Sequence, residues 1–511
     1  MKLKILAIIT IILTISSVSV NASETLSSSI KEASQNTAFI DSQWQQLNED
    51  GFGSIYNRGP RGIAIFNDKL VVGTANYNQE IKLTFNKTYS VRSFLYELIM
   101  HSDVNGMYDN MKSDGCEIWS YDGQNLQQLV GLNGYVPSGF GDKNNTEVGV
   151  LIEFKNYLYA GIRNHVKGCE IWRTSDLQNW ELVLDRGNGN RLNGGVWDAA
   201  ILNDVLYVGT INFGNGCEIF STKTGNLNDW DVVVGEKAKT GSGFGTKSNF
   251  YVWSMCAYDN WLYVGTDNLK GGGELWKTKD GENWKPVLAY RGWINAKLHG
   301  ADYPRGFDGG FLNYRGGIRN MVVYNDELYC GFCGEDVRFT FRLSKIKLFT
   351  IRQQCPFIKL RFLHYLDSPG LEIWKYNSSK DKWTRVVGGI RKGNFSGGFG
   401  DIKNEYPWSM DVYDGYLYVG TLREEPINTV ISINKEDLKK GFIGITIETP
   451  YGGAQIWRFD GKEWMKINED GFGDLYNVGI REMKVYDNSL IACTMNLETG
   501  FEMWKYNIPS E

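Results

Sequence analysis

The stretch Leu262 to Trp284, LYVGTDNLKGGGELWKTKDGENW, has variants along almost the whole chain. It consists of an apolar segment ending in Gly-Thr, a turn, a second segment of the form Gly-x-Glu-Leu-Trp, a polar turn and a further Trp. A unit that recurs about every fifty residues is typical of repeat architectures, in which each unit is one supersecondary structure packed on its neighbours. Copies of the first segment begin at Leu70, Leu158, Leu206, Leu262, Leu328, Leu417 and Leu490.

Each copy predicts four short antiparallel strands: an apolar strand a, strand b with the LYVGT pattern, strand c with the GxEIW pattern, and strand d around the second Trp. The 59 Gly, 28 Tyr, 25 Phe and 17 Trp favour short strands joined by tight turns. We therefore predict an all-β protein, with residues 41–508 forming one seven-bladed β-propeller of four-stranded antiparallel blades.

The last copy lacks a strand d of its own, because the chain ends soon after Trp504. The missing strand has a counterpart near the N-terminus, where residues 44–53 (WQQLNEDGFG) match residues 464–473 (WMKINEDGFG). We predict that this N-terminal strand completes the last blade and closes the ring, which satisfies edge hydrogen bonds that an open array would expose.

Residues 1–22 resemble a cleaved secretory signal, with Lys2 and Lys4, an Ile/Leu-rich run and a Val-Asn-Ala ending, and residues 23–40 are predicted to be a linker. Removing residues 1–22 takes the formal net charge from -5 to -7, which disfavours nucleic acid as a partner. No second apolar run reaches the length of a membrane span. We expect a secreted or cell-surface protein without a stable membrane span.

Three insertions, at residues 78–114, 334–368 and 422–451, separate strands b and c of their units. In antiparallel blades the b–c loops share one face with the d–a connections, which are long and rich in Gly here. Loops on a rigid scaffold are where binding usually resides. This face is therefore the expected functional face. The basic segment between Val337 and Leu366 is a solvated hairpin excursion, a locally misread coding sequence, or a contact for a polyanion or a membrane surface.

Strand a is innermost in a propeller, so residues at its start are expected to surround the mouth of a central channel. Aligned on the turn that follows strand a, one column of the repeats holds Arg61, Gly149, Trp197, Trp253, Arg319, Trp408 and Arg481. Arg and Trp together suit stacking on a sugar ring and charge-assisted bonding to a carboxylate, sulfate or phosphate. The next column includes Asp198 and Glu482. A second interpretation remains open, in which these side chains wedge between blades and the Arg residues pair with the strand c carboxylates.

Residues that recur in nearly every unit are expected to be scaffold. They include the strand c residues Glu117, Glu170, Glu218, Glu274, Glu372 and Glu502, and the strand b residues Asn76, Asn164, Asn212, Asn268 and Asn496. Cys116, Cys169 and Cys217 share a column with small and apolar residues and are expected to be buried thiols. Neither the Cys330/Cys333 pair nor the four His residues has metal-ligand spacing, so no metal or cofactor is predicted.

The turns Arg173–Trp180 and Lys277–Trp284 resemble the Asp-box of sialidase-type propellers, although they are one residue shorter, and Glu372–Trp383 resembles a kelch repeat. A sialidase would imply an arginine triad, which Arg61, Arg319 and Arg481 could mimic, but the Phe-Arg-Ile-Pro signature of that family is absent. The resemblance implies a fold and not an activity. The expected function is non-catalytic binding of a glycan, an anionic small ligand or another extracellular ligand at the channel mouth. The alternatives are a glycoside hydrolase or lyase of sialidase-like architecture and a cell-surface protein-interaction or structural module.

Overall fold

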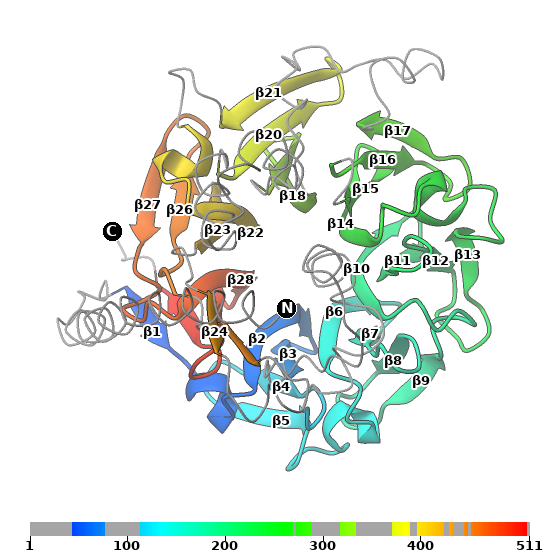
Figure 1. The fold of residues 1–511 in the computed structure, drawn as a ribbon, viewed down its shortest axis with the longest axis horizontal. Coiled ribbons are helices and arrows are strands. Elements are labelled where there is room, and N and C mark those ends of the chain that lie inside the picture. Colours follow the sequence, from blue (N-terminus) through cyan, green and yellow to red (C-terminus); the bar gives the residue numbers. More distant parts are fainter. Residues whose placement is uncertain are drawn as a thin grey trace, which may run out of the picture.

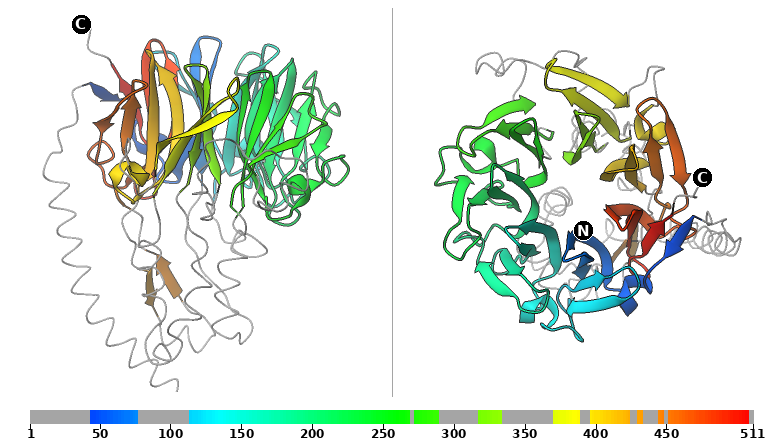
Figure 2. Two further views of the ribbon diagram at one scale, coloured as in Figure 1. Left: turned by 90° about the horizontal axis from the view of Figure 1, so that it is seen from above. Right: turned by 180° about the vertical axis from the view of Figure 1, so that it is seen from behind.

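The computed structural model of the chain is built from short strands arranged around a common centre (Figures 1 and 2). It describes residues 43–76, 113–268, 272–288, 317–333, 370–388, 396–423 and 451–507, and the backbone of residues 429–432 and 444–447. The predicted signal sequence, the linker and most of the three insertions lie outside these ranges. No helix among the described residues is both long and apolar enough to cross a membrane.

The strands pair antiparallel in groups of four along the chain, and the first strand of each group lies nearest the centre (Figure 1). The first two groups are β2 (Asn57–Phe66), β3 (Lys69–Asn76), β4 (Ile118–Tyr121) and β5 (Leu126–Val130), then β6 (Glu147–Phe154), β7 (Tyr157–Arg163), β8 (Glu170–Thr174) and β9 (Glu181–Leu184). Two more are β10 (Gly195–Leu202), β11 (Val205–Ile211), β12 (Ile219–Thr222) and β13 (Asp231–Val234), then β14 (Tyr251–Tyr258), β15 (Trp261–Asp267), β16 (Leu275–Thr278) and β17 (Lys285–Leu288).

The later groups follow the same order. They are β18 (Ile318–Tyr324), β19 (Glu327–Phe332), β20 (Glu372–Asn377) and β21 (Lys382–Val387), then β22 (Asn404–Tyr413), β23 (Tyr416–Arg423), β26 (Ile456–Phe459) and β27 (Trp464–Asn468). A separate hairpin holds β24 (Thr429–Ser432) and β25 (Gly444–Ile447). The last group contains β28 (Asn477–Tyr486), β29 (Ser489–Asn496) and β30 (Met503–Tyr506).

The N-terminal strand β1 (Trp44–Gln46) pairs antiparallel with β30, so residues from the two ends of the described chain lie side by side (Figure 1). Trp44 stands opposite Tyr506 and packs edge-on against Phe472, as Trp464 packs against Phe399 in the preceding group. β1 therefore takes the outer position that β27 takes one group earlier.

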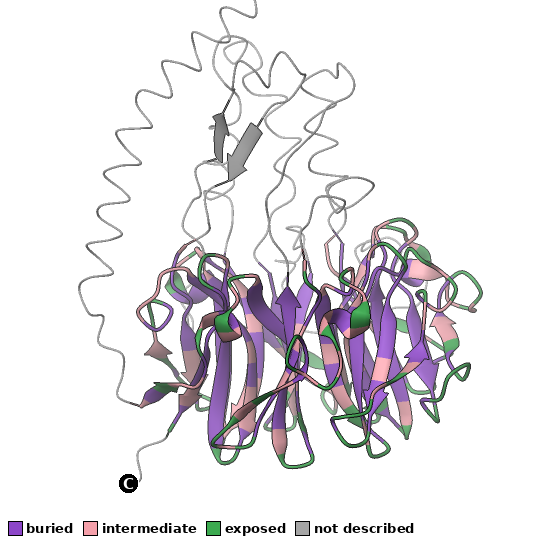
Figure 3. Ribbon diagram, turned by 90° about the horizontal axis from the view of Figure 1, so that it is seen from below, coloured by how far each residue is buried: buried purple, intermediate pink, exposed green. Residues whose placement is uncertain are grey.

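Neighbouring groups pack face to face, and their apolar clusters lie between them. The innermost strands contact one another in the order β2, β6, β10, β14, β18, β22 and β28, and β28 also contacts β2. Figure 3 shows buried residues along the strands and exposed residues gathered in the turns. This arrangement is that of an all-β propeller.

A repeating set of hydrogen bonds explains the recurrent strand c carboxylates. Glu170 accepts bonds from Trp172 Nε1 (2.9 Å) and Asn145 Nδ2 (2.8 Å). Asn145 is fully buried, and its Oδ1 accepts a bond from Asn164 of strand b. Gln455 makes the same two contacts with its amide oxygen, so the position requires an acceptor and not a charge. The Asn members of this set, absent from the sequence prediction, are Asn57, Asn145, Asn193, Asn249, Asn404 and Asn477.

The Gly-Phe-Gly connections between groups are also scaffold. Gly139 and Phe140 both have left-handed backbones, with φ of 59° and 56°. This turn places the Phe140 ring on Trp172 at 4.6 Å with an interplanar angle of 8°. The same stacking joins Phe52 to Trp119, Phe244 to Trp276, Phe399 to Trp457 and Phe472 to Trp504.

The c–d turns and the thiols have structural roles. Asp176 accepts backbone bonds from Gln178 and Asn179, and these bonds, with the Asn179 side chain, lower the pKa of Asp176 to about 2. Such a carboxylate is a turn former. Cys116, Cys169 and Cys217 are buried free thiols, as expected, and burial raises the pKa of each.

Candidate functional site

The predicted Arg/Trp column coincides with a β-bulge in each innermost strand. In β10, for example, the pairing with β11 shifts between Val196 and Asp198, so Trp197 is the extra residue. A bulge bends the strand and re-aims the side chain it carries. The residues inside these irregularities include Arg61, Gly149, Trp197, Trp253, Arg319, Trp408 and Arg481. The six with large side chains, Arg61, Trp197, Trp253, Arg319, Trp408 and Arg481, are called the Arg/Trp ring below.

Glycines on the following strands make room for two of the Trp rings. A Cβ placed on Gly317 would lie 2.2 Å from Cε3 of Trp253, and one placed on Gly479 would lie 2.2 Å from Cε3 of Trp408. No side chain fits at such distances. Each Trp therefore reaches from its own group over the innermost strand of the next.

Tryptophan and arginine alternate along one part of the ring, from Trp253 through Arg319 and Trp408 to Arg481. The Cζ atom of Arg319 lies 5.4 Å from the ring centroid of Trp253 and 5.7 Å from that of Trp408. The Cζ atom of Arg481 also lies over the Trp408 ring, 5.4 Å from its centroid. These are cation–π distances, and desolvated contacts of this kind contribute up to about 2 kcal/mol each.

Arg61 on β2 extends past β6 of the second group and contacts Trp197 on β10 of the third group. Its Cζ lies 4.0 Å from the Trp197 centroid, and its Nε donates to the Trp197 carbonyl oxygen at 3.1 Å. The intervening column member is Gly149, where an added Cβ would lie 2.0 Å from the carbonyl oxygen of Val196. The absence of a side chain at Gly149 thus permits the close packing of β6 on β10.

A buried carboxylate holds the remaining arginine. Glu147 accepts bonds from Nη2 of Arg481 (2.5 Å) and Nη1 of Arg163 (3.1 Å). Burial alone would raise the pKa of Glu147, but the guanidinium groups of Arg481 and Arg163 outweigh burial and hold this pKa below its ordinary value. The expectation that the arginines would pair with strand c carboxylates is wrong for Arg481, because those carboxylates already hold Asn and Trp side chains.

Four side chains of the second predicted column tie an innermost strand to the next. They bond to backbone groups of the neighbouring innermost strand. The contacts are Met255 N to Asp198 Oδ2 (2.7 Å), Ser254 Oγ to Ile318 O (2.8 Å), Asn320 Nδ2 to Trp408 O (3.3 Å) and Ser409 Oγ to Ile480 O (2.8 Å). Asp198 is thus partly a structural residue.

Glu482 differs from the other members of this column. Its carboxylate is half-buried and has no hydrogen-bond or ion-pair partner among the described residues. Burial raises the pKa of Glu482 to about 7, against the opposing attraction of Arg61, Arg319 and Arg481. Burial likewise raises the pKa of Asp198 to about 6.

Two guanidinium groups of the Arg/Trp ring keep unused donors. Nη1 of Arg61 is buried and has no hydrogen-bond partner in the described part of the chain. Arg319 is 5% exposed and contacts the Trp rings, but it forms no hydrogen bond or ion pair with a described residue. Burial lowers the pKa of Arg61 to about 10 and, together with repulsion from Arg61 and Arg481, lowers that of Arg319.

The structure therefore brings all eight predicted residues together at the centre. Sequence reasoning missed the roles of Arg163, Tyr251 and Tyr406. Tyr251 packs between Trp197 and Trp253, at 4.9 and 6.1 Å between centroids, and Tyr406 lies 5.9 Å from Trp253. Each aromatic stands just before the bulge, which is the signal that could have identified it.

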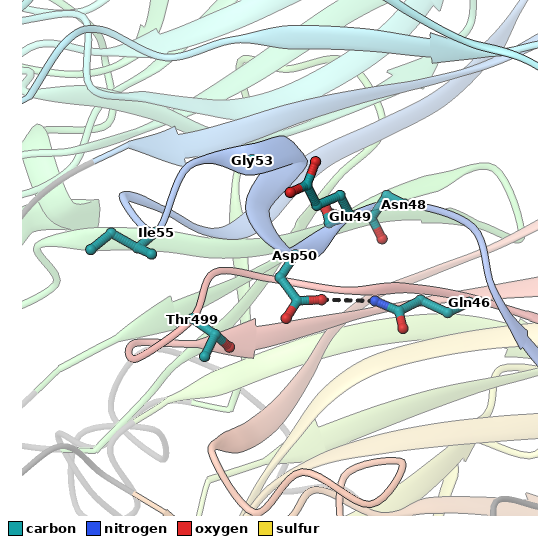
Figure 4. A pocket seen from close by; sticks show the side chains of 7 residues that line it. All are labelled: Gln46, Asn48, Glu49, Asp50, Gly53, Ile55 and Thr499. Atoms are coloured by element: carbon teal, nitrogen blue, oxygen red, sulfur yellow. Dashed lines mark hydrogen bonds between the residues drawn. The ribbon is translucent and has the colours of Figure 1, made fainter.

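Two other features do not form comparable sites. His165 is half-buried and accepts a bond from Arg163, and burial together with the Arg163 charge lowers the pKa of His165. A shallow pocket beside β1 is lined by the side chains drawn in Figure 4, where Asp50 accepts a bond from Gln46 at 2.8 Å. Nowhere in the described ranges do three or more His, Cys, Asp or Glu side chains gather as a metal site would require.

Comparisons with known proteins identify no family. No family model matches the chain, and no curated protein matches it. Among solved structures, the chain is similar to the GH74 xyloglucanase from Xanthomonas campestris, at 11% identity and a TM-score of 0.45 over 90% of this chain and 53% of that one. It is also similar to the WD40 β-propeller domain of Doa1, at 10% identity and a TM-score of 0.39 over 91% and 97% of the two chains. The chain thus spans about half the length of the xyloglucanase.

Proposed function

We propose that this chain is a secreted, non-catalytic, seven-bladed β-propeller, closed by β1, which binds an extracellular ligand at the Arg/Trp ring. The ligand that fits best is a glycan carrying a carboxylate, sulfate or phosphate group. The observation that carries the proposal is the buried Arg319 guanidinium, which forms no hydrogen bond or ion pair with a described residue and lies between two Trp rings.

The arginines of the Arg/Trp ring repel one another. Arg61 and Arg481 both lower the pKa of Arg319, so their positive charges act on one another at the centre. Buried charges without partners are costly, because the protein interior solvates them poorly. An anion that accepts bonds from Arg61 Nη1 and Arg319 would remove that cost.

The aromatic residues add a surface for a sugar. Trp253 and Trp408 are half-buried, so part of each indole remains accessible. Aromatic faces beside guanidinium donors suit a ring-shaped ligand that bears a charged group.

An array of acidic and neutral glycans tests the proposal. Acidic members should bind wild-type protein, and Arg319→Gln should weaken that binding strongly. Arg458→Gln is the matched control, because Arg458 also stacks on an aromatic ring, at 4.5 Å from Tyr416, but lies outside the ring. Retention of only neutral glycans, unaffected by Arg319→Gln, would reject the site.

One observation favours a hydrolase as the second candidate. Asp198 and Glu482 are two carboxylates at the centre whose pKa values are raised to about 6 and about 7, a range suited to general acid catalysis. Turnover of chromogenic glycosides that is lost in both Asp198→Asn and Glu482→Gln would favour this candidate over simple binding.

A further inference from the structure

Glu482 lies in the positive electrostatic field of the ring arginines, where an anionic ligand would also bind. Glu482 belongs to the same column as Asp198, Ser254, Asn320 and Ser409. Each of these four side chains bonds to the backbone of the next innermost strand, whereas the Glu482 carboxylate has no such bond in the described residues. It is instead attracted by Arg61, Arg319 and Arg481 without touching them. The carboxylate therefore acts as a loosely held internal counter-ion.

We propose that an anion entering the Arg/Trp ring binds to its guanidinium groups and replaces Glu482 as their counter-ion. Glu482 takes up one proton from solvent as the anion binds. This inference rests on the proposed function, because it requires an anion at the ring. It goes further by making ligand release a response to rising pH.

The charges around Glu482 support proton uptake. Arg481 and Arg163 are engaged with Glu147, which leaves Arg61 and Arg319 to balance Asp198 and Glu482. A dianion placed there adds negative charge beside Glu482, and a nearby like charge favours the neutral carboxyl. The groups that act on Glu482 are Arg61 on β2, Asp198 on β10, Arg319 on β18, Arg481 on β28 and Cys493 on β29. Glu147 on β6 and Tyr406 on β22 act on the ring arginines.

The direction of the pH effect follows from linkage. Without ligand the Glu482 carboxyl has a pKa of about 7, and a bound anion raises that pKa further. Between the two pKa values binding takes up a proton, so affinity falls as pH rises and approaches a loss of about tenfold per pH unit. Below the lower pKa the carboxyl is already neutral and affinity is flat.

Calorimetric titration with inorganic sulfate tests the inference, because sulfate stays a dianion from pH 5 to pH 9. Titrations in buffers with different ionisation enthalpies measure the protons taken up per sulfate. Wild-type protein should take up close to one proton near pH 8 and almost none at pH 5. Glu482→Gln should bind sulfate with little pH dependence and more tightly than wild type above pH 7.

Asp411→Asn is the matched control. Asp411 is another inner-strand carboxylate whose pKa burial raises, but it accepts bonds from the Val412 and Val485 amides and is not among the groups that most affect the pKa of Arg61 or Arg319. This variant should keep the wild-type pH dependence. Even if Glu482→Gln does not fold, the proton count on wild-type protein shows whether sulfate binding takes up a proton, and a count near zero at pH 8 overturns the inference.

The outcomes separate the two proposals. Sulfate binding without proton uptake, or with equal uptake in Glu482→Gln, overturns the role of Glu482 and leaves the anion site intact. No sulfate binding between pH 5 and pH 9 overturns the anion site and the role of Glu482 together.

Discussion

Trp44→Ala tests whether the N-terminal strand holds the first and last groups together. Trp44 is 5% exposed, lies 5.0 Å from Phe472 and 4.7 Å from Tyr506 between centroids, and pairs with β30. Replacing a buried Trp by Ala removes these contacts and leaves a cavity, at a cost of about 3–5 kcal/mol. We expect the free energy of unfolding to fall by that amount.

The effect should extend beyond β30, because the segment after β1 contacts both the last group and the first. Asn48 accepts a bond from Met503 N at 2.6 Å, and the Phe52 ring stacks on Trp119 of β4 at 4.3 Å. Loss of β1 pairing should therefore expose sites in both the first and the last group to protease.

The assay is denaturant unfolding followed by Trp fluorescence, with limited proteolysis alongside it. Gln45→Ala is the control, because Gln45 is exposed on the same strand and its backbone pairing does not depend on its side chain. A change below about 1 kcal/mol in Trp44→Ala, within the range of ordinary surface substitutions, would refute the closure by β1.

Three further predictions concern the scaffold and the centre. Glu502→Gln should stabilise the protein at pH 8 and not at pH 5, because burial raises the pKa of Glu502 to about 7. Gln455 shows that an amide oxygen makes the same two bonds at the equivalent position. Thermal unfolding at the two pH values checks this prediction. The sign follows because a raised carboxyl pKa gives stability below the unfolded pKa and loses it as pH rises to the folded one. Asn193→Ala should cost about 1–3 kcal/mol, measured by chemical denaturation, since it leaves buried partners such as Glu218 unsatisfied. Gly149→Ala should lower the melting temperature, because its methyl group would meet the Val196 carbonyl; an unchanged melting temperature would contradict the close packing there.

Much of the fold could be predicted from the sequence, because each strand is marked by a short segment that recurs in every unit. The LYVGT segment predicted β3, β11, β15 and their equivalents, and the match between residues 44–53 and 464–473 predicted where β1 pairs. The recurrence of Glu170 in other units predicted a structural role, which its bonds to Trp172 and Asn145 confirm.

The partners of the central residues could not be predicted in the same way. Arg61 contacts Trp197, and Arg481 contacts Glu147, across 136 and 334 positions of sequence. Those contacts depend on bulges that re-aim single side chains and on small residues such as Gly149 that let groups approach. An alignment of the repeats shows which residues occupy equivalent positions in their strands, but it does not show which of those residues contact one another.

Sulfate binding by Arg319→Gln is the most direct test of the central claim that the Arg/Trp ring is an anion site. At pH 5.5, where Glu482 is protonated, wild-type protein and the Arg458→Gln control should bind sulfate equally. Arg319→Gln should bind about 10- to 100-fold more weakly, since a hydrogen bond to a charged group contributes about 1.5–3 kcal/mol. Equal sulfate affinity in all three proteins, or no binding in any of them, would contradict the account.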